Sequence, residues 1–188
     1  MENNKVYLSF GRHGRYGRDT AIERLSMLEA YLSGRYLSAN YPFCDTIYFS
    51  PIARAVQTAQ FRALGMNCEH LIEAQKLAED TPTFEVHKFI NTILSFCEDE
   101  RHLHFVTHLP VIEKLGLGEL GCGETIMLEA DNWQEMLCEN FTPEFVPMPD
   151  IEECAELLQK LGYTAQEFNK APADEIYLKI KNLDISLL

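Results

Sequence analysis

A histidine that is preceded by an arginine and flanked by glycines follows the first apolar run of the chain. Residues 6–10 are Val-Tyr-Leu-Ser-Phe, which predicts a buried strand, and residues 11–14 are Gly-Arg-His-Gly. At the carboxyl end of a strand, His13 and Arg12 can meet a phosphoryl group with a nucleophile and a counter-charge together. The motif is short, and a structural histidine at a strand end is the alternative.

A second motif, at residues 48–59, places an arginine at the start of a predicted helix. Residues 44–49 favour a buried strand, Ser50 is suited to be the helix N-cap, and Pro51 fits the first turn, which needs no backbone donor. Arg54 then lies in the opening turn, where free amides and the helix dipole favour an anion and a guanidinium can clamp it. The alternative is an ordinary surface arginine.

A third motif places another histidine just past another strand. Residues 103–110 are Leu-His-Phe-Val-Thr-His-Leu-Pro, so His108 follows an apolar run. Ligands of open α/β sheets bind beyond the carboxyl ends of the strands. The strand ends that carry Arg12 and His13, Arg54, and His108 are therefore expected to converge on one anion site.

In this order the motifs resemble those of the histidine phosphatase superfamily, the phosphoglycerate mutase-like proteins. The resemblance rests on Arg-His-Gly, Ser-Pro-x-x-Arg-Ala-x-x-Thr-Ala and a later strand-end histidine, and it covers about residues 5 to 130. It implies a three-layer α/β/α fold with a mostly parallel central sheet. It also implies that His13 becomes phosphorylated while Arg12, Arg54 and His108 hold the phosphoryl oxygens.

The chemistry of phosphoryl transfer agrees with these roles, because positioning and electrostatic stabilisation must supply most of the acceleration. His13 must attack as neutral imidazole, so its other ring nitrogen is expected to donate to a carbonyl near Gly11 or Gly14. The arginines take the part that Mg²⁺ plays in many such sites, so we expect no metal and no organic cofactor. His102 and His104 share a strand face, but no cysteine or carboxylate stands at ligand spacing, which favours a structural role.

The nature of the substrate depends on a proton donor. An alkoxide that leaves from a phosphate ester needs a proton, whereas an imidazole that leaves from phosphohistidine needs less help. The sugar-phosphate members of the family that this chain resembles commonly use a glutamate shortly after the second motif. Glu79 and Asp80 are the candidate acids here, and a solvated turn before the next helix is the alternative.

The chain length and the Thr-His-Leu-Pro form of the third motif look more like the SixA-like phosphohistidine phosphatases. Those proteins remove phosphate from a histidine of a signalling phosphotransfer domain. Our first hypothesis is therefore a histidine-nucleophile phosphatase that acts on phosphohistidine or on a small phosphomonoester. The alternatives are a phosphoglycerate mutase-like sugar-phosphate phosphatase or mutase, and a regulatory module that binds phosphate without turnover.

Residues 11–18 contain three arginines and no acidic residue, in a chain whose formal net charge is −13. This contrast favours an anion site, and a solvated loop is the alternative. Arg15 and Arg18 could bind a second anionic group on a small metabolite. Together with Gly14 they form the candidate substrate-binding set.

The composition bounds the fold and the partners. The chain has 188 residues, of which 46% are hydrophobic and 24% charged, and this favours one domain over residues 1–188 with a core at about 5–130 and an extension at about 140–188. The negative charge disfavours nucleic acid and anionic membranes as partners and leaves a phosphorylated substrate. No run of transmembrane length and no secretory signal pattern is present, so we expect a cytoplasmic protein. The sequence does not specify an oligomeric state.

Apolar spacing predicts helices and strands that alternate along most of the chain. One helix is expected between a capping box at residues 20–23 and a stop at Gly34, and another after a cap formed by Thr164 and Glu167. The remaining helices are expected at 52–64, 83–98, 110–115 and 151–161, and the later strands at 71–72, 103–107, 125–129 and 176–181.

Overall fold

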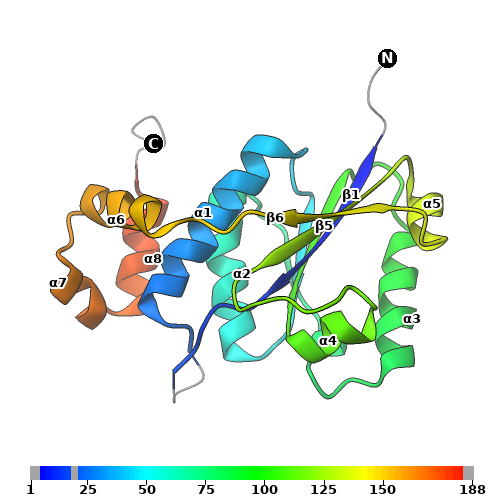
Figure 1. Cartoon of the computed structure of the whole chain (residues 1–188), viewed down its shortest axis with the longest axis horizontal. Helices are drawn as coiled ribbons and strands as arrows, with labels where there is room; N and C mark the ends of the chain where they lie inside the picture. Colours follow the sequence, from blue (N-terminus) through cyan, green and yellow to red (C-terminus); the bar gives the residue numbers. More distant parts are fainter. Residues whose placement is uncertain (1–4, 18–20, 184–188) are drawn as a thin grey trace.

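The computed structural model describes residues 5–17 and 21–183, in which one six-stranded sheet carries helices on both faces (Figure 1). The strand order is β3-β2-β4-β1-β5-β6. This is the three-layer α/β/α arrangement that the motifs implied. The strands are β1 (Val6–Arg12), β2 (Thr46–Phe49), β3 (Leu71–Glu73), β4 (His102–Thr107), β5 (Thr125–Ala130) and β6 (Thr142–Val146).

The four strands on one side of the sheet run parallel. β3, β2, β4 and β1 pair in this sense, whereas β5 is antiparallel to β1 and β6 is antiparallel to β5. Arg12, the last residue of β1, pairs with Thr107, the last residue of β4, and Phe49 of β2 pairs with Val106. The carboxyl ends of β1, β2 and β4 therefore meet at one edge of the sheet, as the motifs predicted.

Helices form the two outer layers. Tyr7 of β1 packs in a core with α1 (Arg24–Asn40) and α2 (Ala53–Met66). Its neighbours Leu8 and Phe10 pack on the other face with α3 (Thr83–Leu94), α4 (Leu109–Lys114) and α5 (Trp133–Leu137). A short 3-10 helix, η1 (Gln75–Leu77), joins β3 to α3. Alternate residues of the central strand thus serve both layers.

α1 does not stop at Gly34 as predicted but continues to Asn40. Gly34 is needed for helix packing instead, because a Cβ on it would lie 2.4 Å from the backbone oxygen of Arg62 on α2. Gly65 on α2 faces α1 in the same way, with an ideal Cβ only 2.1 Å from the carbonyl of Tyr31. The two glycines let α1 and α2 approach backbone to backbone. The predicted cap residue Thr20 lies outside the described residues, and Glu23 precedes the helix without a side-chain cap.

The start of α2 also differs from the prediction. Ile52, rather than Ser50, is the N-cap, and Pro51 lies in the turn ahead of the helix. The hydroxyl of Ser50 is 2.8 Å from Nε2 of His108, so a contact between two strand ends takes the place of the expected cap. Arg54 nevertheless occupies the opening turn, as predicted.

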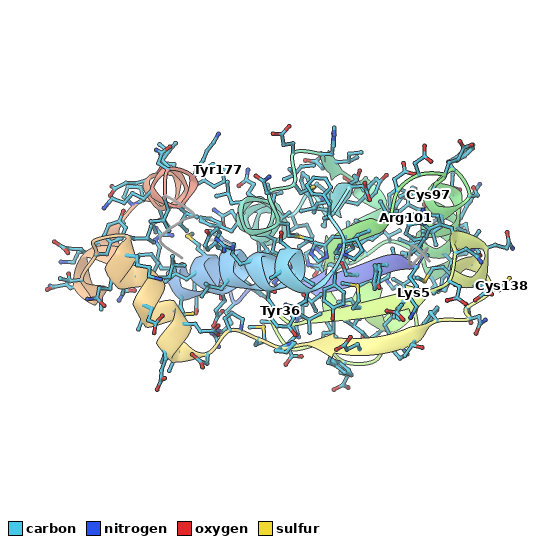
Figure 2. The ribbon with its side chains drawn as sticks, turned by 90° about the horizontal axis from the view of Figure 1, so that it is seen from above. Lys5, Tyr36, Cys97, Arg101, Cys138 and Tyr177 are labelled. Atoms are coloured by element: carbon cyan, nitrogen blue, oxygen red, sulfur yellow. The ribbon has the colours of Figure 1, made fainter. Side chains whose placement is uncertain are left out.

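Three helices follow β6 and gather at the end of the molecule beside α1 (Figure 1). They are α6 (Ile151–Lys160), α7 (Ala165–Lys170) and α8 (Ala173–Lys181). Seen from above, Tyr177 of α8 lies far from Lys5 and Cys138 at the opposite end (Figure 2). Leu157 and Phe168 from these helices share a core with Met27 of α1, so the carboxyl-terminal segment packs against the outer side of the α1–α2 layer.

The prediction of a strand at residues 176–181 was wrong, because this segment belongs to α8. The sequence Ile-Tyr-Leu-Lys-Ile-Lys alternates like a strand, but it also places Ile176 and Ile180 one helical turn apart. Both are buried in the core with α1 and α2, so the helical period prevails.

The helix predicted at 83–98 ends at Leu94, and the capping box at Thr164 is confirmed. None of the helices among the described residues has the length and apolar character needed to cross a membrane.

Candidate active site

The residues that the motifs singled out come together at the carboxyl edge of the sheet. His13 follows β1, His108 follows β4, and Arg54 lies in the first turn of α2. The ring centroids of His13 and His108 are 5.0 Å apart, and Nε of Arg54 is 3.0 Å from Nε2 of His13. The positive charge of Arg12 acts on both imidazoles. The four side chains therefore converge, as their strand positions predicted.

His13 is held as a neutral imidazole with a defined tautomer. Its Nδ1 lies 2.8 Å from the carbonyl of Gly14, which can only accept, so Nδ1 carries the proton and donates it. This is the carbonyl contact that the sequence predicted. Nε2 is then the unprotonated nitrogen, and its lone pair accepts a hydrogen bond from Arg54. Burial, supported by the charges of Arg54 and Arg12, lowers the pKa of His13 to about 4, so the ring is neutral at neutral pH.

His108 faces His13 with one ring nitrogen unused. Its Nε2 bonds the hydroxyl of Ser50, and its buried Nδ1 has no hydrogen-bond partner within the described chain. Burial, together with His13 and the neighbouring arginines, lowers the pKa of His108 to about 3. The ring is therefore neutral, and the 3.7 Å between its Nδ1 and Oε2 of Glu79 is no ion pair. In the tautomer in which Ser50 donates to Nε2, the proton of His108 is on Nδ1 and can be donated to an oxyanion.

Arg12 carries the second unpartnered buried nitrogen of this group of side chains. Its Nη1 donates to the carbonyl of Leu120 at 2.8 Å, which anchors the guanidinium, while its buried Nε finds no partner in the part of the chain that the structure describes. Orphaned buried donors are uncommon in folded proteins and call for an explanation. A phosphoryl group bound over His13 would offer oxygens to Arg12 and to His108 together.

Glu79 contacts the converging side chains through Arg54, whereas its neighbour Asp80 forms no ion pair with them. Arg54 is buried, and its Nη2 donates to Oε2 of Glu79 at 2.8 Å. The Glu79 side chain is 47% exposed, so a carboxyl group stands at the solvent side of the arginine. Asp80 is exposed and forms no ion pair with any described residue. The sequence could not separate these two neighbouring acids.

Tyr16 covers the site, and sequence reasoning missed it. The centroid of its ring lies 4.6 Å from Cζ of Arg54 and 5.3 Å from the centroid of the His13 ring. The tyrosine is 46% exposed, so its ring forms a wall between the buried imidazole and solvent. Its signal in the sequence is only an aromatic residue three positions after His13, which is too common to interpret without the structure.

The remaining candidates of the arginine-rich loop are placed differently. The amide of Gly14 donates to Oγ1 of Thr58 at 3.0 Å, so this N–H is already used within the protein. The guanidinium of Arg15 pairs with the carboxylate of Glu29, and its charge is thus balanced internally. Arg18 lies outside the described residues. The proposed second anion site therefore has no free cation among the described residues of this loop beyond Arg12.

His102 and His104 take part in a hydrogen-bonded network rather than a metal site. Oγ of Ser9 lies 2.8 Å from Nε2 of His102 and 2.7 Å from Nδ1 of His104, and both imidazoles are fully buried. Within residues 5–17 and 21–183, no cluster of three or more histidine, cysteine or carboxylate side chains is arranged to hold a metal ion. The contacts agree with the structural role that the sequence favoured.

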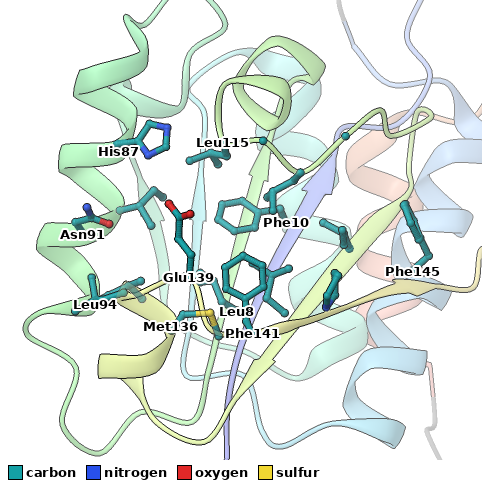
Figure 3. Close-up of a pocket in the computed structure, with 18 residues that line it drawn as sticks. Leu8, Phe10, His87, Asn91, Leu94, Leu115, Met136, Glu139, Phe141 and Phe145 are labelled. Atoms are coloured by element: carbon teal, nitrogen blue, oxygen red, sulfur yellow. The ribbon is translucent and has the colours of Figure 1, made fainter.

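A cavity of about 530 Å³ lies on the α3 and α5 face of the sheet, separate from the imidazole site (Figure 3). Leu8 and Phe10 of β1 form part of its floor, and Phe141 and Phe145 line it on the β6 side. Its lining includes Glu139 and, among the described residues, no lysine or arginine. An apolar cavity with a single carboxylate disfavours a phosphate dianion. Phosphate binding is therefore to be expected at the sheet edge and not in this cavity.

Four buried neutral histidines make the stability depend on pH. Burial lowers the pKa of His13 and His102 to about 4, that of His108 to about 3, and that of His104 well below 6.5. Below pH 6.5 the unfolded chain binds protons that the folded chain cannot, so the free energy of unfolding falls as the pH drops towards 4. We expect losses of up to about 1.4 kcal/mol per pH unit for each histidine. Urea unfolding at pH 7, 6 and 5 measures this, and equal stability at all three values would contradict it.

Solved structures share this fold at low sequence identity. The protein histidine phosphatase SixA complexed with tungstate is 16% identical, with a TM-score of 0.61 over 81% of this chain and 99% of that chain. A mycobacterial glucosyl-3-phosphoglycerate phosphatase is 14% identical, with a TM-score of 0.55 over 75% and 97%. A mutant phosphoserine phosphatase from Entamoeba histolytica in complex with phosphoserine is 13% identical, with a TM-score of 0.53 over 79% and 98%.

No protein-family model and no curated protein matches the sequence. The likeness to the solved structures shows that the chain has the fold of the phosphoglycerate mutase-like histidine phosphatases. The shared part covers most of those chains.

Proposed function

We propose that this protein is a phosphatase that passes a phosphoryl group from its substrate to His13 and then to water. The observation that carries the proposal is the pair of unpartnered buried nitrogens, Arg12 Nε and His108 Nδ1, beside a neutral His13 whose Nε2 lone pair faces Arg54. The SixA structure of the same fold holds tungstate, an oxyanion of the shape of phosphate. A phosphorylated substrate is the partner that this set of groups would recognise.

In the first chemical step, Nε2 of His13 attacks phosphorus, a nitrogen–phosphorus bond forms and the bond to the leaving group breaks. Nε of Arg54 now bonds the lone pair of Nε2, so it must move to a phosphoryl oxygen before attack. Arg12 and His108 donate to the other oxygens and stabilise the transferring group. The ring of His13 gains a positive charge as it is phosphorylated, and the carbonyl of Gly14 on Nδ1–H stabilises that charge.

In the second step a water molecule attacks the phosphorylated His13. The nitrogen–phosphorus bond breaks, inorganic phosphate leaves, and the neutral imidazole returns. The carboxylate of Glu79 is in place to take the proton of that water, because it lies against Arg54 at the exposed side of the site. In the first step the same group, once protonated, would give its proton to an alkoxide.

The position of Glu79 bears on the substrate class. Phosphohistidine remains the first candidate, because its imidazole leaving group depends little on an acid. The contact between Glu79 and Arg54 specifically favours the second candidate, a small phosphomonoester, because it supplies the proton donor that such a substrate needs. The direct test is phosphate release by the wild-type chain from a phosphohistidine protein, an aryl phosphate and a panel of sugar phosphates. Silence on all of them would contradict the phosphatase.

Glu79→Gln separates the two substrate classes. We expect it to slow the first step, phosphoryl transfer to His13, by about 10²–10³-fold for alkyl and sugar phosphates, because general acid catalysis is lost, and by less than tenfold for phosphohistidine. Single-turnover rates of leaving-group release from both substrates measure the difference, because they do not include the later attack of water. Asp80→Asn is the matched control, since it removes a neighbouring exposed carboxylate outside the site and should leave both rates unchanged. An equal loss on both substrates would show that Glu79 acts by holding Arg54 and not as an acid.

A further inference from the structure

Arg62, in the second half of α2, is a positive charge buried against β1, the strand that leads to His13. It is completely inaccessible to solvent and lies against β1 at Gly11, where an ideal Cβ would be only 1.5 Å from its Nη1. A glycine at position 11 therefore makes room for this guanidinium. Burial lowers the pKa of Arg62 to about 10, so the group remains charged at neutral pH.

The charge of Arg62 has no carboxylate partner within the described chain. Its Nη1 lies 3.1 Å from Nε2 of His104 and its Nη2 donates to the carbonyl of Gly123 at 2.6 Å, while Nε has no partner among the described residues. A buried charge without a counter-ion is costly, and proteins usually pair it. An anion bound nearby would offset that cost.

The partners of Arg62 specify every proton of a longer network. Arg62 can only donate, so Nε2 of His104 accepts and its Nδ1–H donates to Oγ of Ser9. The hydroxyl of Ser9 then donates to Nε2 of His102, whose Nδ1–H donates to the carbonyl of Pro42 at 3.3 Å. In this arrangement every ring nitrogen of the two histidines has a partner. The guanidinium is thus held by a buried hydrogen-bonded chain that links side chains of β1 and β4.

The other end of Arg62 leads to the candidate nucleophile. Gly123, whose carbonyl accepts from Arg62, donates its amide to the carbonyl of His13 at 3.0 Å. The amide of His13 in turn donates to the carbonyl of Thr107 at 3.0 Å. Arg62 is therefore two hydrogen bonds away from the backbone of His13, in a dry interior where charge is weakly screened.

We propose that Arg62 is a positioning residue of the phosphate site, which holds the His13 segment through Gly123 and adds a buried positive charge that favours a bound phosphoryl group without touching it. This inference rests on the proposed function in that it needs a phosphoryl group at His13. The buried charge of Arg62 is unfavourable in the free protein. A dianion that binds over Arg12 and His108 attracts this charge and thereby offsets the unfavourable free energy.

Oxyanion affinity of the full chain tests the proposal, with orthovanadate and inorganic phosphate as the probes in calorimetric titrations. Arg62→Met keeps the volume and removes the charge, and we expect it to weaken both affinities by roughly tenfold. Arg62→Lys keeps the charge and loses the bridge, so affinity should stay within about threefold while kcat falls by about tenfold or more. Should the methionine variant not fold, Arg62→Gln gives the same comparison with a donor retained.

Leu157→Ala is the matched control, because it opens a buried site in the separate core beside α1 and lowers stability without touching the network. Its vanadate affinity should equal that of the wild type. A methionine variant that binds vanadate within twofold of the wild type, or a Leu157→Ala variant that loses as much affinity, would overturn the proposal. If the wild type binds vanadate but hydrolyses no substrate, the proposed phosphatase activity is refuted and the proposed role of Arg62 is not. If the wild type binds no oxyanion, both proposals are refuted.

Discussion

His13→Ala is expected to lower phosphate release from every substrate by about 10⁴-fold or more, because it removes the group that is placed to accept the phosphoryl group. Nε2 of His13 is the unprotonated nitrogen at the point where Arg12, Arg54 and His108 meet. The other three side chains would still hold the substrate, but no covalent intermediate could form. Initial rates with an aryl phosphate and with a phosphohistidine protein measure the loss.

The same variant should keep its affinity for phosphate and vanadate, since the oxygen-binding groups remain. His87→Ala is a matched control: this half-buried histidine on α3 bonds the carbonyl of Lys114 and lines the separate cavity, so its removal should leave the rates unchanged. Rapid quenching of the wild type at high pH should also trap an acid-labile phosphohistidine that the alanine variant lacks. Turnover within tenfold of the wild type by His13→Ala would rule out His13 as the nucleophile.

These measurements also separate an enzyme from a phosphate-binding module. A module would be stabilised by phosphate against thermal unfolding but would release none from any substrate. Its His13→Ala variant would differ little from the wild type, because no step would depend on the lone pair of Nε2. The unpartnered buried nitrogens of Arg12 and His108 are compatible with either outcome, so turnover decides between the two.

The position of the site could be predicted from the sequence because strand ends can be recognised locally. The apolar runs before His13 and His108 are buried strands, the run before Arg54 is a strand in which only Ile47 is buried, and parallel pairing brings their carboxyl ends to one edge. The carbonyl partner of His13 followed from chemistry, since a neutral imidazole that attacks through one nitrogen needs an acceptor for the other. The local sequence pattern and the chemistry of imidazole were sufficient to predict that these four side chains lie together.

Contacts between distant segments could not be predicted in this way. Glu79 and Asp80 are adjacent in sequence, and only the packing of their turn against α2 shows that Glu79 reaches Arg54. Gly11 and Arg62 are far apart in sequence, yet the guanidinium occupies the space of the missing Cβ. Serine is a residue type favoured at helix N-caps, but His108 lies close to Ser50 and its ring is the partner of the Ser50 hydroxyl.

The edges of the fold were harder to predict than its centre. β6 was missed because only Val146 of this edge strand is buried, so the strand lacks an alternating apolar pattern. α8 was mistaken for a strand because a short segment of six residues fits both periods. In both cases the deciding factor is the surface against which the segment packs, and this information lies outside the segment itself.

Arg54→Gln is expected to lower kcat/KM by about 10²–10³-fold, the effect of removing a donor that stabilises the charge of the transition state. Arg54 contributes at three points: its Nε bonds Nε2 of His13, its Nη2 bonds Glu79, and its guanidinium stacks on Tyr16. Arg54→Lys should recover little of the loss, because an ammonium group cannot make these contacts together. Arg24→Gln, which removes an arginine that bonds the carbonyl of Ala171 outside the site, is the matched control and should change the rate less than twofold.

The pH profile adds a readout that a merely structural role for Arg54 would not change. Burial is the main cause of the low pKa of His13, and the charge of Arg54 adds to it. Removing that charge relieves the repulsion of an imidazolium, so the pKa of His13 should rise from about 4 towards 6.5 without reaching it. Because only the neutral ring attacks, the acid limb of kcat/KM should move to higher pH in Arg54→Gln. An unchanged limb, or a lysine variant with the wild-type rate, would show that Arg54 does not act on the reacting groups.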